Sequence, residues 1–441
     1  MATDLPKLEA EFAAIAGAEN VVASEGGWLV SPASTEEVAG VLRIANARGL
    51  PVKVIGAATK QDWFNPLDFH AGRPGIVLRT GRMHSVREHA AQDLTAIVDA
   101  GCAWGEMQRQ LAQQGQRVAL DPLWPERATI GGIVAANDSG ALRLRYGSLR
   151  DLIIGMTIVL ADGTIARSGG KVVKNVAGYD MHKLMTGAAG TLGVITQVNF
   201  RLHPVEQVVR TLTVRSLDLA PLERLMHEIS DSQMVVNAMQ LRLRAEADGK
   251  EMHALDVMFA AGAECVEEQA KWLRLSAMRL HVEEAGRGVW LARQSVFESA
   301  SRREAASRIA AASQAEAASP MEAASVFKVS LLPQDIARFL AHLQAAASGA
   351  GLRCAGVAQA TGLITASLMG DASASAALLR SLRAEVESRS GSLALQSALP
   401  QIGPGLDRWG ASIDALPLMR RVKQALDPNC ILNPGRFVGG I

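Results

Sequence analysis

The stretch Gly187-Ala-Ala-Gly-Thr-Leu-Gly193 runs directly into Val194-Ile-Thr-Gln-Val-Asn-Phe200. Its glycine spacing superficially matches a dinucleotide-binding fingerprint, in which the glycine loop must open a helix whose N-terminus faces a pyrophosphate. The residues that follow are β-branched and alternate between apolar and polar, so they predict a strand. The sequence therefore argues against a Rossmann-type NAD-binding fold.

A second glycine cluster lies upstream of this stretch. Thr129-Ile-Gly-Gly132 follows the irregular loop Asp121-Pro-Leu-Trp-Pro125, and Asn137, Ser139 and Gly140 come soon after. Paired glycines allow the backbone to approach a ligand closely and leave amides free to donate to phosphate oxygens. The alternative is a set of ordinary tight turns, which is the more frequent use of any single glycine.

The remainder of the chain alternates strands and helices. Ser34 and Glu37 form a capping-box pattern at a helix start, and Gly49 ends that helix. Strands are expected at 152–160 and 194–202, with a hairpin turn at Asp162-Gly163. Further helices are expected at 105–114 and 417–426, and further strands at 209–215, 236–244, 254–259, 326–331 and 362–369. Because Pro204 separates two such patterns, we predict an α+β protein with a domain boundary near residue 205.

Composition excludes several classes of protein. The 441 residues include 49% hydrophobic residues and carry a net charge of +1, which predicts a large core and argues against a nucleic-acid binder. No C-x-x-C pair joins the four cysteines, so we predict small buried thiols in a reducing compartment and neither an iron–sulfur nor a zinc site. Residues 1–11 show no signal peptide, and the longest apolar run, 152–161, is too short to span a membrane.

Several strings together resemble the FAD domain of vanillyl-alcohol-oxidase-type flavoproteins, also called PCMH-type. The most specific is Gly169-Gly-Lys-Val-Val-Lys-Asn-Val-Ala-Gly-Tyr-Asp180, which is similar to the glycolate-oxidase and D-lactate-dehydrogenase branch, especially the FAD-binding E subunits of bacterial glycolate oxidase. The tail 426–437 matches the segment by which that branch closes over the flavin. The other matching strings are Lys53–Lys60, Ile97–Gly101, Ala128–Ala136, Tyr146–Asp151 and Thr186–Thr196.

The resemblance implies three parts and a set of FAD contacts. These parts are a two-subdomain FAD-binding domain over 1–205, an α+β cap domain over 206–395 with an Ala/Ser-rich insertion near 299–325, and a C-terminal segment, 396–441, that returns to the flavin. The implied contacts are Gly56, Ala57, Ala58, Thr59 and Lys60 at the pyrophosphate, Thr129, Ile130, Gly131, Gly132, Asn137 and Gly140 at the phosphates and ribityl chain, Gly190, Gly193 and Ile195 at the adenine end, and Asn433 and Arg436 near the isoalloxazine.

Two departures from the family pattern bear on the cofactor. The pyrophosphate loop has one glycine where many relatives have two or three, so Ala57 or Ala58 must accept the backbone angles of that loop. Ala189 occupies a position that is often acidic in these relatives. No histidine lies between Gly56 and Gln61, where some relatives attach their flavin covalently, so we expect non-covalent FAD.

A substrate-oxidising site is harder to find. Oxidation of a 2-hydroxy acid needs a group that fixes the carboxylate and a base for the hydroxyl proton. Catalytic relatives use a set rich in His and Glu, often with a metal, whereas no histidine follows His342 here and we expect no metal. The cationic candidates are Arg242, Arg244, Arg293 and Lys328, for which solvated surface charges are the alternative.

The resemblance implies an FAD-binding subunit of a multi-subunit glycolate oxidase (dehydrogenase) that oxidises glycolate to glyoxylate. Its expected partners are a catalytic flavoprotein subunit and an iron–sulfur subunit, and its expected location is the cytoplasm, peripheral to the inner membrane through that complex. One alternative is a stand-alone D-2-hydroxy-acid dehydrogenase of the D-lactate type, with Arg242, Arg244 or Lys328 holding the substrate. Another is a structural subunit that keeps the fold and lacks redox turnover.

Overall fold

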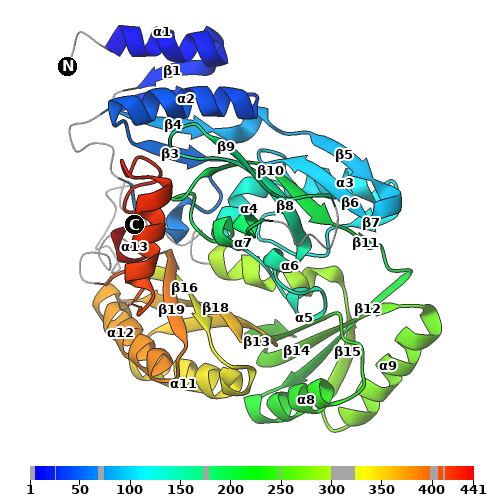
Figure 1. Ribbon diagram of the computed structural model, residues 1–441. Helices are drawn as coiled ribbons and strands as arrows, with labels where there is room; N and C mark the ends of the chain where they lie inside the picture. Colours follow the sequence, from blue (N-terminus) through cyan, green and yellow to red (C-terminus); the bar gives the residue numbers. More distant parts are fainter. Residues whose placement is uncertain are drawn as a thin grey trace, which may run out of the picture. The chain divides into compact units, whose positions relative to one another are not determined.

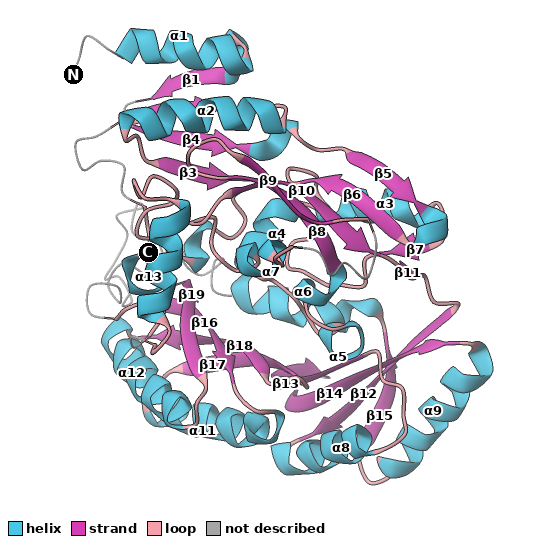
Figure 2. Cartoon of the chain, viewed as in Figure 1, coloured by secondary structure: helices cyan, strands magenta, loops and turns pink. Residues whose placement is uncertain are grey.

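The computed structural model describes residues 5–24, 26–67, 74–171, 178–247, 250–298, 323–397, 406–410 and 413–441 (Figure 1). The chain divides into two compact units. The first comprises Met1–Ser139, Gly147–Val205 and Ser412–Ile441, and the second comprises Gly140–Tyr146 and Glu206–Ala411. Both units mix helices with sheets, which confirms the predicted α+β class (Figure 2).

A four-stranded sheet begins the first unit, in the order β1-β2-β4-β3. β1 and β2 are antiparallel, whereas β2, β4 and β3 run parallel. Helices α1 and α2 contribute Phe12 and Leu42 to the same buried cluster as Trp28 and Ile76 of the sheet. The bounds are α1 (Leu5–Ala16), β1 (Val21–Ser24), β2 (Gly27–Val30), α2 (Thr35–Arg48), β3 (Val52–Ile55) and β4 (Gly75–Arg79).

The start of α2 confirms half of the predicted capping box. The Ser34 hydroxyl accepts a hydrogen bond from the Glu37 amide at 3.1 Å. The Glu37 carboxylate, however, accepts from the amide of Ala33 at 2.8 Å, one residue before the expected partner. Gly49 ends the helix in the left-handed region, as expected.

A five-stranded antiparallel sheet follows, in the order β5-β6-β10-β8-β9. β8 and β9 pair through the predicted hairpin at Asp162-Gly163. β10 begins directly after Gly193, which confirms that a strand follows the glycine stretch. The bounds are β5 (Val86–Ala90), β6 (Thr95–Asp99), α3 (Trp104–Ala112), β7 (Gln116–Arg117), α4 (Ile130–Ala136), α6 (Leu149–Leu152), β8 (Ile153–Val159), β9 (Ile165–Gly169), α7 (Met181–Met185), β10 (Val194–Arg201) and β11 (His203–Pro204).

The second unit is one eight-stranded antiparallel sheet with helices on one face (Figures 1 and 2). The strand order is β15-β12-β14-β13-β17-β18-β16-β19, and the main apolar core lies between the sheet and helices α8, α9, α11 and α12. The bounds are α5 (Arg143–Tyr146), β12 (Val208–Ser216), α8 (Leu219–Asp231), β13 (Ala238–Ala247), β14 (Lys250–Ala261), α9 (Ala263–Ser276), β15 (His281–Ala285), β16 (Ala323–Ser330), α11 (Ile336–Gly349), β17 (Arg353–Gln359), β18 (Leu363–Gly370), α12 (Ala372–Ser388) and β19 (Ser392–Ser397).

The five strands expected beyond Pro204 correspond to β12, β13, β14, β16 and β18, with ends shifted by one to four residues. β15, β17 and β19 were not expected. Most of the Ala/Ser-rich segment near 299–325, and residues 172–177 of the most family-specific stretch, lie outside the described residues. The helix expected at 417–426 is α13 (Leu416–Leu426).

The cysteines depart from the prediction. Cys102 and Cys354 are buried, but Cys265 and Cys430 are exposed, because each lies on the solvent side of a surface helix or tail. Among the described residues, no group of three or more His, Cys, Asp or Glu side chains could hold a metal ion. The same residues include no helix with the length and apolar character that crossing a bilayer requires.

Candidate functional site

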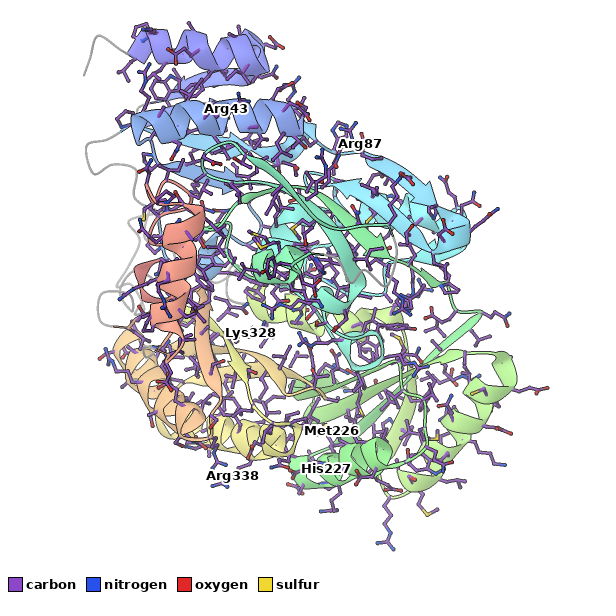
Figure 3. The ribbon with its side chains drawn as sticks, viewed as in Figure 1. Arg43, Arg87, Met226, His227, Lys328 and Arg338 are labelled. Atoms are coloured by element: carbon purple, nitrogen blue, oxygen red, sulfur yellow. The ribbon has the colours of Figure 1, made fainter. Side chains whose placement is uncertain are left out.

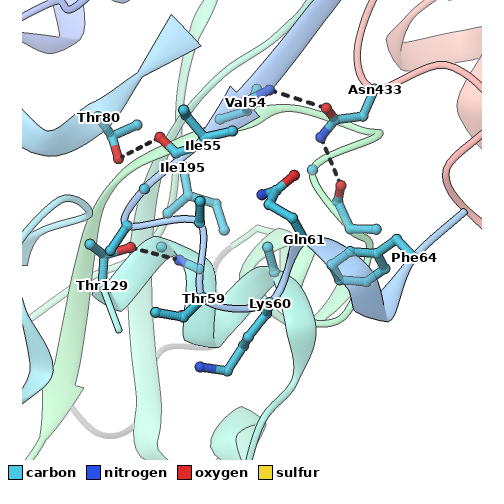
Figure 4. Close-up of a pocket in the computed structure, with 18 of the residues that line it drawn as sticks. Val54, Ile55, Thr59, Lys60, Gln61, Phe64, Thr80, Thr129, Ile195 and Asn433 are labelled. Carbon is cyan, nitrogen blue, oxygen red and sulfur yellow. Dashed lines mark hydrogen bonds between the residues drawn. The ribbon is translucent and has the colours of Figure 1, made fainter. Parts of the chain in front are cut away.

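Three segments far apart in sequence line one cavity of the first unit (Figure 4). They are the end of β3 with the loop after it, the start of α4, and the loop before β10, and the C-terminal tail joins them. The cavity measures about 660 Å³, which includes space open to solvent. The residues predicted to contact FAD that lie in its wall are Gly56, Ala57, Ala58, Thr59, Lys60, Thr129, Gly131, Gly132, Gly190, Gly193, Ile195, Asn433 and Arg436.

Three of the predicted contacts do not line this cavity. Ile130 points into the core, where it is fully buried. Asn137 ends α4 in the left-handed region, and Gly140 belongs to the second unit. Conversely, sequence reasoning missed Gln61, Phe64 and other residues of the wall, although Gln61 directly follows the predicted loop.

The backbone of the wall is strained at residues other than glycine. Ala58, Ala189 and Asn433 have φ values of 57°, 54° and 41°. Residues with a Cβ rarely adopt this left-handed region, and such strain gathers at ligand sites because the surrounding structure must hold it. Ala58 therefore adopts the unusual angles that the glycine-poor loop was expected to impose.

The glycines of the wall serve mainly to let segments approach one another. A Cβ on Gly56 would lie 2.0 Å from the Thr129 hydroxyl, and a Cβ on Gly190 would lie 2.6 Å from Nδ2 of Asn433. Gly132 differs, because its Cβ would meet only the Thr129 hydroxyl, at 3.2 Å. Bulk added at Gly132 would therefore enter the cavity.

The amides expected to be free at the second glycine cluster are already bonded within the protein. Residues 130–136 form a helix, α4, whose first turn holds both glycines. The Gly131 amide donates to the Ala100 carbonyl at 2.7 Å, and the Gly132 amide donates to the Thr129 hydroxyl at 3.4 Å. The physical reason is helix capping: Thr129 satisfies an amide that would otherwise face the cavity.

Lys60, which was predicted to lie at the pyrophosphate, lines the cavity, but its ammonium is bonded within the protein. Its ammonium lies 3.3 Å from the Asp138 carboxylate and donates to the Leu123 carbonyl at 3.2 Å. The same ammonium lies 5.7 Å and 5.3 Å from the ring centroids of Trp63 and Trp124. Lys60 thus anchors the loop through a buried ion pair.

Arg436 supplies the other positive charge of the wall. It is buried, donates from Nη2 to the Gln61 carbonyl at 2.9 Å, and lies 5.1 Å from the Phe64 ring centroid. Burial, followed by repulsion from Arg436, lowers the pKa of nearby Lys53. Among the described residues that line the cavity, none is Asp or Glu, so the wall favours an anionic ligand.

The C-terminal tail is fixed to the wall by side chains. Asn433 accepts from the Val54 amide at 3.1 Å and donates to the Ala189 carbonyl at 2.8 Å, so it joins β3 to the loop before β10. The buried ammonium of Lys423 donates to the Thr191 carbonyl at 2.8 Å and to Asp427 at 2.5 Å. Sequence reasoning missed this ion pair, although its i,i+4 spacing on a helix was a usable signal.

The cationic candidates for substrate binding lie in the second unit. Arg242 donates from Nε and Nη2 to the Asp256 carboxylate at 2.7 Å and 2.8 Å, and Asp256 is fully buried. This bidentate pair shows that Arg242 is not a solvated surface charge, and its role in holding a substrate stays a prediction. The second arginine of the predicted pair, Arg244, lies in β13, but its side chain is outside the described set.

The other two candidates also lie in ordered parts of this unit. Lys328, labelled in Figure 3, is half-buried on β16. It pairs in register with Thr365 of β18. Arg293 is buried. Neither residue is brought into the cavity of the first unit, whose lining residues all belong to that unit.

Comparison with protein families identifies two regions. Residues 28–169 match the family "FAD binding domain", and residues 409–437 match "FAD linked oxidases, C-terminal domain". The two matches include the loop after β3, the start of α4 and the tail, which supply most of the cavity wall.

Known proteins give concordant matches. The chain is 28% identical to the mitochondrial D-lactate dehydrogenase [cytochrome] of Arabidopsis thaliana, over 93% of this chain and 73% of that protein. It is 34% identical to glycolate oxidase subunit GlcD of Bacillus subtilis over 42% of this chain, and 34% identical to D-lactate dehydrogenase of Archaeoglobus fulgidus over 46%. The last two matches span 38% and 44% of those relatives, less than half of their length.

Solved structures share the fold at low sequence identity. p-Cresol methylhydroxylase with bound substrate is 16% identical, with a TM-score of 0.70 that covers 99% of this chain and 97% of that one. Alkyldihydroxyacetonephosphate synthase is also 16% identical, with a TM-score of 0.72 that covers 97% and 84%. These likenesses confirm the PCMH-type fold that the sequence motifs implied.

The cavity fits FAD by its own chemistry. Its described lining includes the buried Arg436 and no Asp or Glu, it holds strained backbone, and it contains one buried acceptor, Oε1 of Gln61, that no described residue satisfies. An anionic pyrophosphate flanked by hydroxyl and N–H groups meets those properties. The chain therefore contains an FAD binding domain and a C-terminal segment that matches FAD linked oxidases, within the PCMH-type fold.

Proposed function

We propose that this chain is the FAD-binding subunit of a multi-subunit glycolate oxidase (dehydrogenase) that converts glycolate to glyoxylate. Bound FAD supplies the chemistry, since it accepts the equivalent of a hydride and passes electrons on. The observation that carries the proposal is a cavity whose described lining includes no Asp or Glu, in the FAD binding domain, alongside an Arg242 that is already paired with Asp256. In this proposal the protein lies in the cytoplasm, peripheral to the inner membrane through its complex.

Different residues of the cavity would bind different parts of FAD. The loop 56–60 and the start of α4 would surround the pyrophosphate, with Arg436 supplying positive charge. Lys60 would act indirectly, because its ammonium holds Asp138 and the Leu123 carbonyl. Asn137 and Gly140 do not line this cavity, so any contact that they make with the phosphates or the ribityl chain would lie outside the described wall.

Features of the second unit support the proposal that this chain works with partners. A bidentate Arg–Asp pair leaves little of the guanidinium for a substrate carboxylate, and the described residues include no metal-binding cluster. The dispersed cysteines hold no recognisable iron–sulfur motif. A catalytic flavoprotein subunit and an iron–sulfur subunit would supply these functions, and the glycolate oxidase relative is itself named as a subunit.

A stand-alone D-2-hydroxy-acid dehydrogenase is the second candidate. Its support is the D-lactate dehydrogenase of Arabidopsis thaliana, which matches 93% of this chain. The second unit also contains buried polar atoms without a described partner, at Oγ of Ser367 and Oε1 of Gln396. Together with Lys328, such atoms would be the starting point for a substrate site.

Activity of the purified single chain separates the two candidates. We expect the chain alone, loaded with FAD, to reduce an artificial dye with neither glycolate nor D-lactate, and the complex isolated from native cells to do so with glycolate. Rapid dye reduction by the single chain would favour the stand-alone dehydrogenase. A flavin that no chemical reductant can reduce in the chain or its complex would favour a structural subunit.

The state of the cofactor is tested first. The purified chain should be yellow, and acid precipitation should release FAD into the supernatant, because no attachment histidine lies between Gly56 and Gln61. Colourless protein that cannot be reconstituted with FAD would refute the assignment of the cavity. Flavin retained in the pellet would refute only the non-covalent part.

A further inference from the structure

The carboxamide of Gln61 is a polar group that the protein itself leaves unsatisfied. Gln61 begins the short 3₁₀ turn Gln61–Trp63, directly after the loop 56–60. Its oxygen, Oε1, is buried and accepts no hydrogen bond from any residue within the described ranges. Figure 4 shows this side chain among the residues of the cavity wall.

The position of Gln61 is fixed through its main chain. Its carbonyl accepts from Nη2 of the buried Arg436 at 2.9 Å, and Arg436 in turn lies against the Phe64 ring. The wall therefore holds the residue in place while its side chain stays without a partner. A loosely placed loop does not account for the unsatisfied oxygen.

Other polar side chains of the wall are bonded within the protein. Asn433 uses both its oxygen and its nitrogen, at Val54 and Ala189. The Thr80 hydroxyl donates to the Ile55 carbonyl at 3.4 Å, and the Thr129 hydroxyl accepts from Gly132. A buried acceptor without a donor is destabilising and therefore rare, so its presence in a ligand cavity points to a donor on the ligand.

We propose that Gln61 is a positioning residue for FAD, whose carboxamide oxygen accepts a hydrogen bond from an N–H or O–H group of the cofactor. The inference rests on the proposal that this cavity holds FAD. Ionised phosphate oxygens donate no proton, so the pyrophosphate is not the partner of Oε1. The donor is a ribityl or ribose hydroxyl, or an N–H of the isoalloxazine or adenine ring.

The substitution Gln61→Met tests this role, because methionine keeps the length of the side chain and lacks the carboxamide. Titration of the full-length apoprotein with FAD, followed by flavin fluorescence, should show binding about tenfold weaker than wild type. The melting temperature of the apoprotein should stay the same or rise, since an apolar group replaces a buried, unpartnered acceptor. The matched control is Gln114→Met, at an exposed glutamine outside the cavity, which should change neither quantity.

Two cofactor fragments locate the donor. Titrations with FMN and with ADP should show the tenfold loss for only one of them, which identifies the half of FAD that Gln61 contacts. Wild-type affinity for FAD in Gln61→Met would overturn the inference. So would a melting temperature that falls in step with affinity, since that marks a purely structural role. Failure of the unsubstituted chain to bind FAD would instead refute the cavity as the FAD site, and this outcome needs no variant.

Discussion

The two units differ in how their buried polar groups are satisfied. In the first, Lys60 is paired with the buried Asp138, but Oε1 of Gln61 in the cavity wall accepts no hydrogen bond from any described residue. In the second, the fully buried Asp256 accepts hydrogen bonds from Arg242, Thr213 and Gln240. The first arrangement is incomplete without a ligand, whereas the second is complete in itself.

This difference bears on where function lies. A site that binds a group must keep charge or hydrogen-bonding capacity available, at a cost in stability, whereas a structural network satisfies its own members. By that criterion the cavity of the first unit is prepared for a ligand, and the Arg242–Asp256 network supports the sheet. The comparison fails if substitutions in the network impair binding or turnover without affecting stability.

The largest effect is expected from Lys423→Met. The change leaves Asp427 buried without its ion-pair partner, which should lower the free energy of unfolding by about 3–5 kcal/mol. FAD affinity should fall as well, because Lys423 also holds the Thr191 carbonyl near the cavity. Urea unfolding of the apoprotein and FAD titration measure the two effects.

Lys183→Met is the matched control for that prediction. Lys183 also pairs with an aspartate close in sequence, Asp180, but both side chains are about half exposed. Solvent screens such pairs, so little change in stability is expected. Equal destabilisation by the two substitutions would show that burial of the Lys423 pair is not what matters.

Arg242→Met tests the second unit. Removal of the guanidinium leaves a fully buried carboxylate with only neutral donors, which should cost about 3 kcal/mol of unfolding free energy. FAD affinity should stay within about twofold of wild type, because Arg242 does not line the cavity. Unchanged stability together with lost turnover of the complex would instead assign Arg242 to the substrate.

Gly132→Val tests the first unit by filling its cavity. The new Cβ meets only the Thr129 hydroxyl, at 3.2 Å, and Gly132 lines the cavity, so we expect the helix to form while FAD is obstructed. Affinity should fall at least about 100-fold, which corresponds to about 2.7 kcal/mol. The far-ultraviolet circular dichroism should match wild type. The control is Gly286→Val, where no atom lies within 4 Å of the new Cβ, and this variant should retain FAD. Loss of the fold in Gly132→Val would contradict a ligand-specific role for Gly132.

Local patterns in the sequence predicted much of the fold. The strand after Gly193, the hairpin at Asp162-Gly163 and the end of α2 at Gly49 each depend on neighbouring residues, and all three are confirmed. α4 was not predicted, since Ile-Gly-Gly-Ile-Val-Ala-Ala contains two helix-weakening glycines. Thr129 caps this helix, and the Gly131 amide donates to the Ala100 carbonyl at 2.7 Å, so tertiary contacts override propensity there.

In the candidate site, too, local sequence predicted the backbone segments but not the contacts between distant residues. Family motifs located the cavity wall, because they mark stretches of backbone. They did not indicate which side chains are already bonded, because the bonding partners lie far away in sequence. Lys60 pairs with Asp138, 78 residues away, and Asn433 donates to Ala189, 244 residues away. Only the folded chain therefore shows that Gln61, one position beyond the predicted loop, keeps an unsatisfied acceptor.

The smallest expected effect is a pH dependence of stability in the first unit. His182 is buried, and its Nδ1 lies 3.0 Å from the Ser168 hydroxyl. Burial lowers the pKa of His182 below the ordinary value of 6.5, an effect that Asp180 opposes and Lys183 adds to. The folded state therefore binds a proton less readily than the unfolded state does.

The sign of the effect follows from that difference. Above pH 6.5 the residue is mostly neutral in both states and contributes no pH dependence. As the pH falls below 6.5, the unfolded state takes up its proton first, so the free energy of unfolding decreases until the folded state is protonated too. The slope from this one group cannot exceed about 1.4 kcal/mol per pH unit. Urea unfolding between pH 7.5 and 5 measures this effect, over a range of roughly two and a half units. The free energy of unfolding should decline less steeply with falling pH in His182→Asn than in wild type. His227→Asn, at a partly exposed histidine of α8 labelled in Figure 3, should keep the wild-type decline. An unchanged slope in His182→Asn would assign the acid sensitivity to other groups.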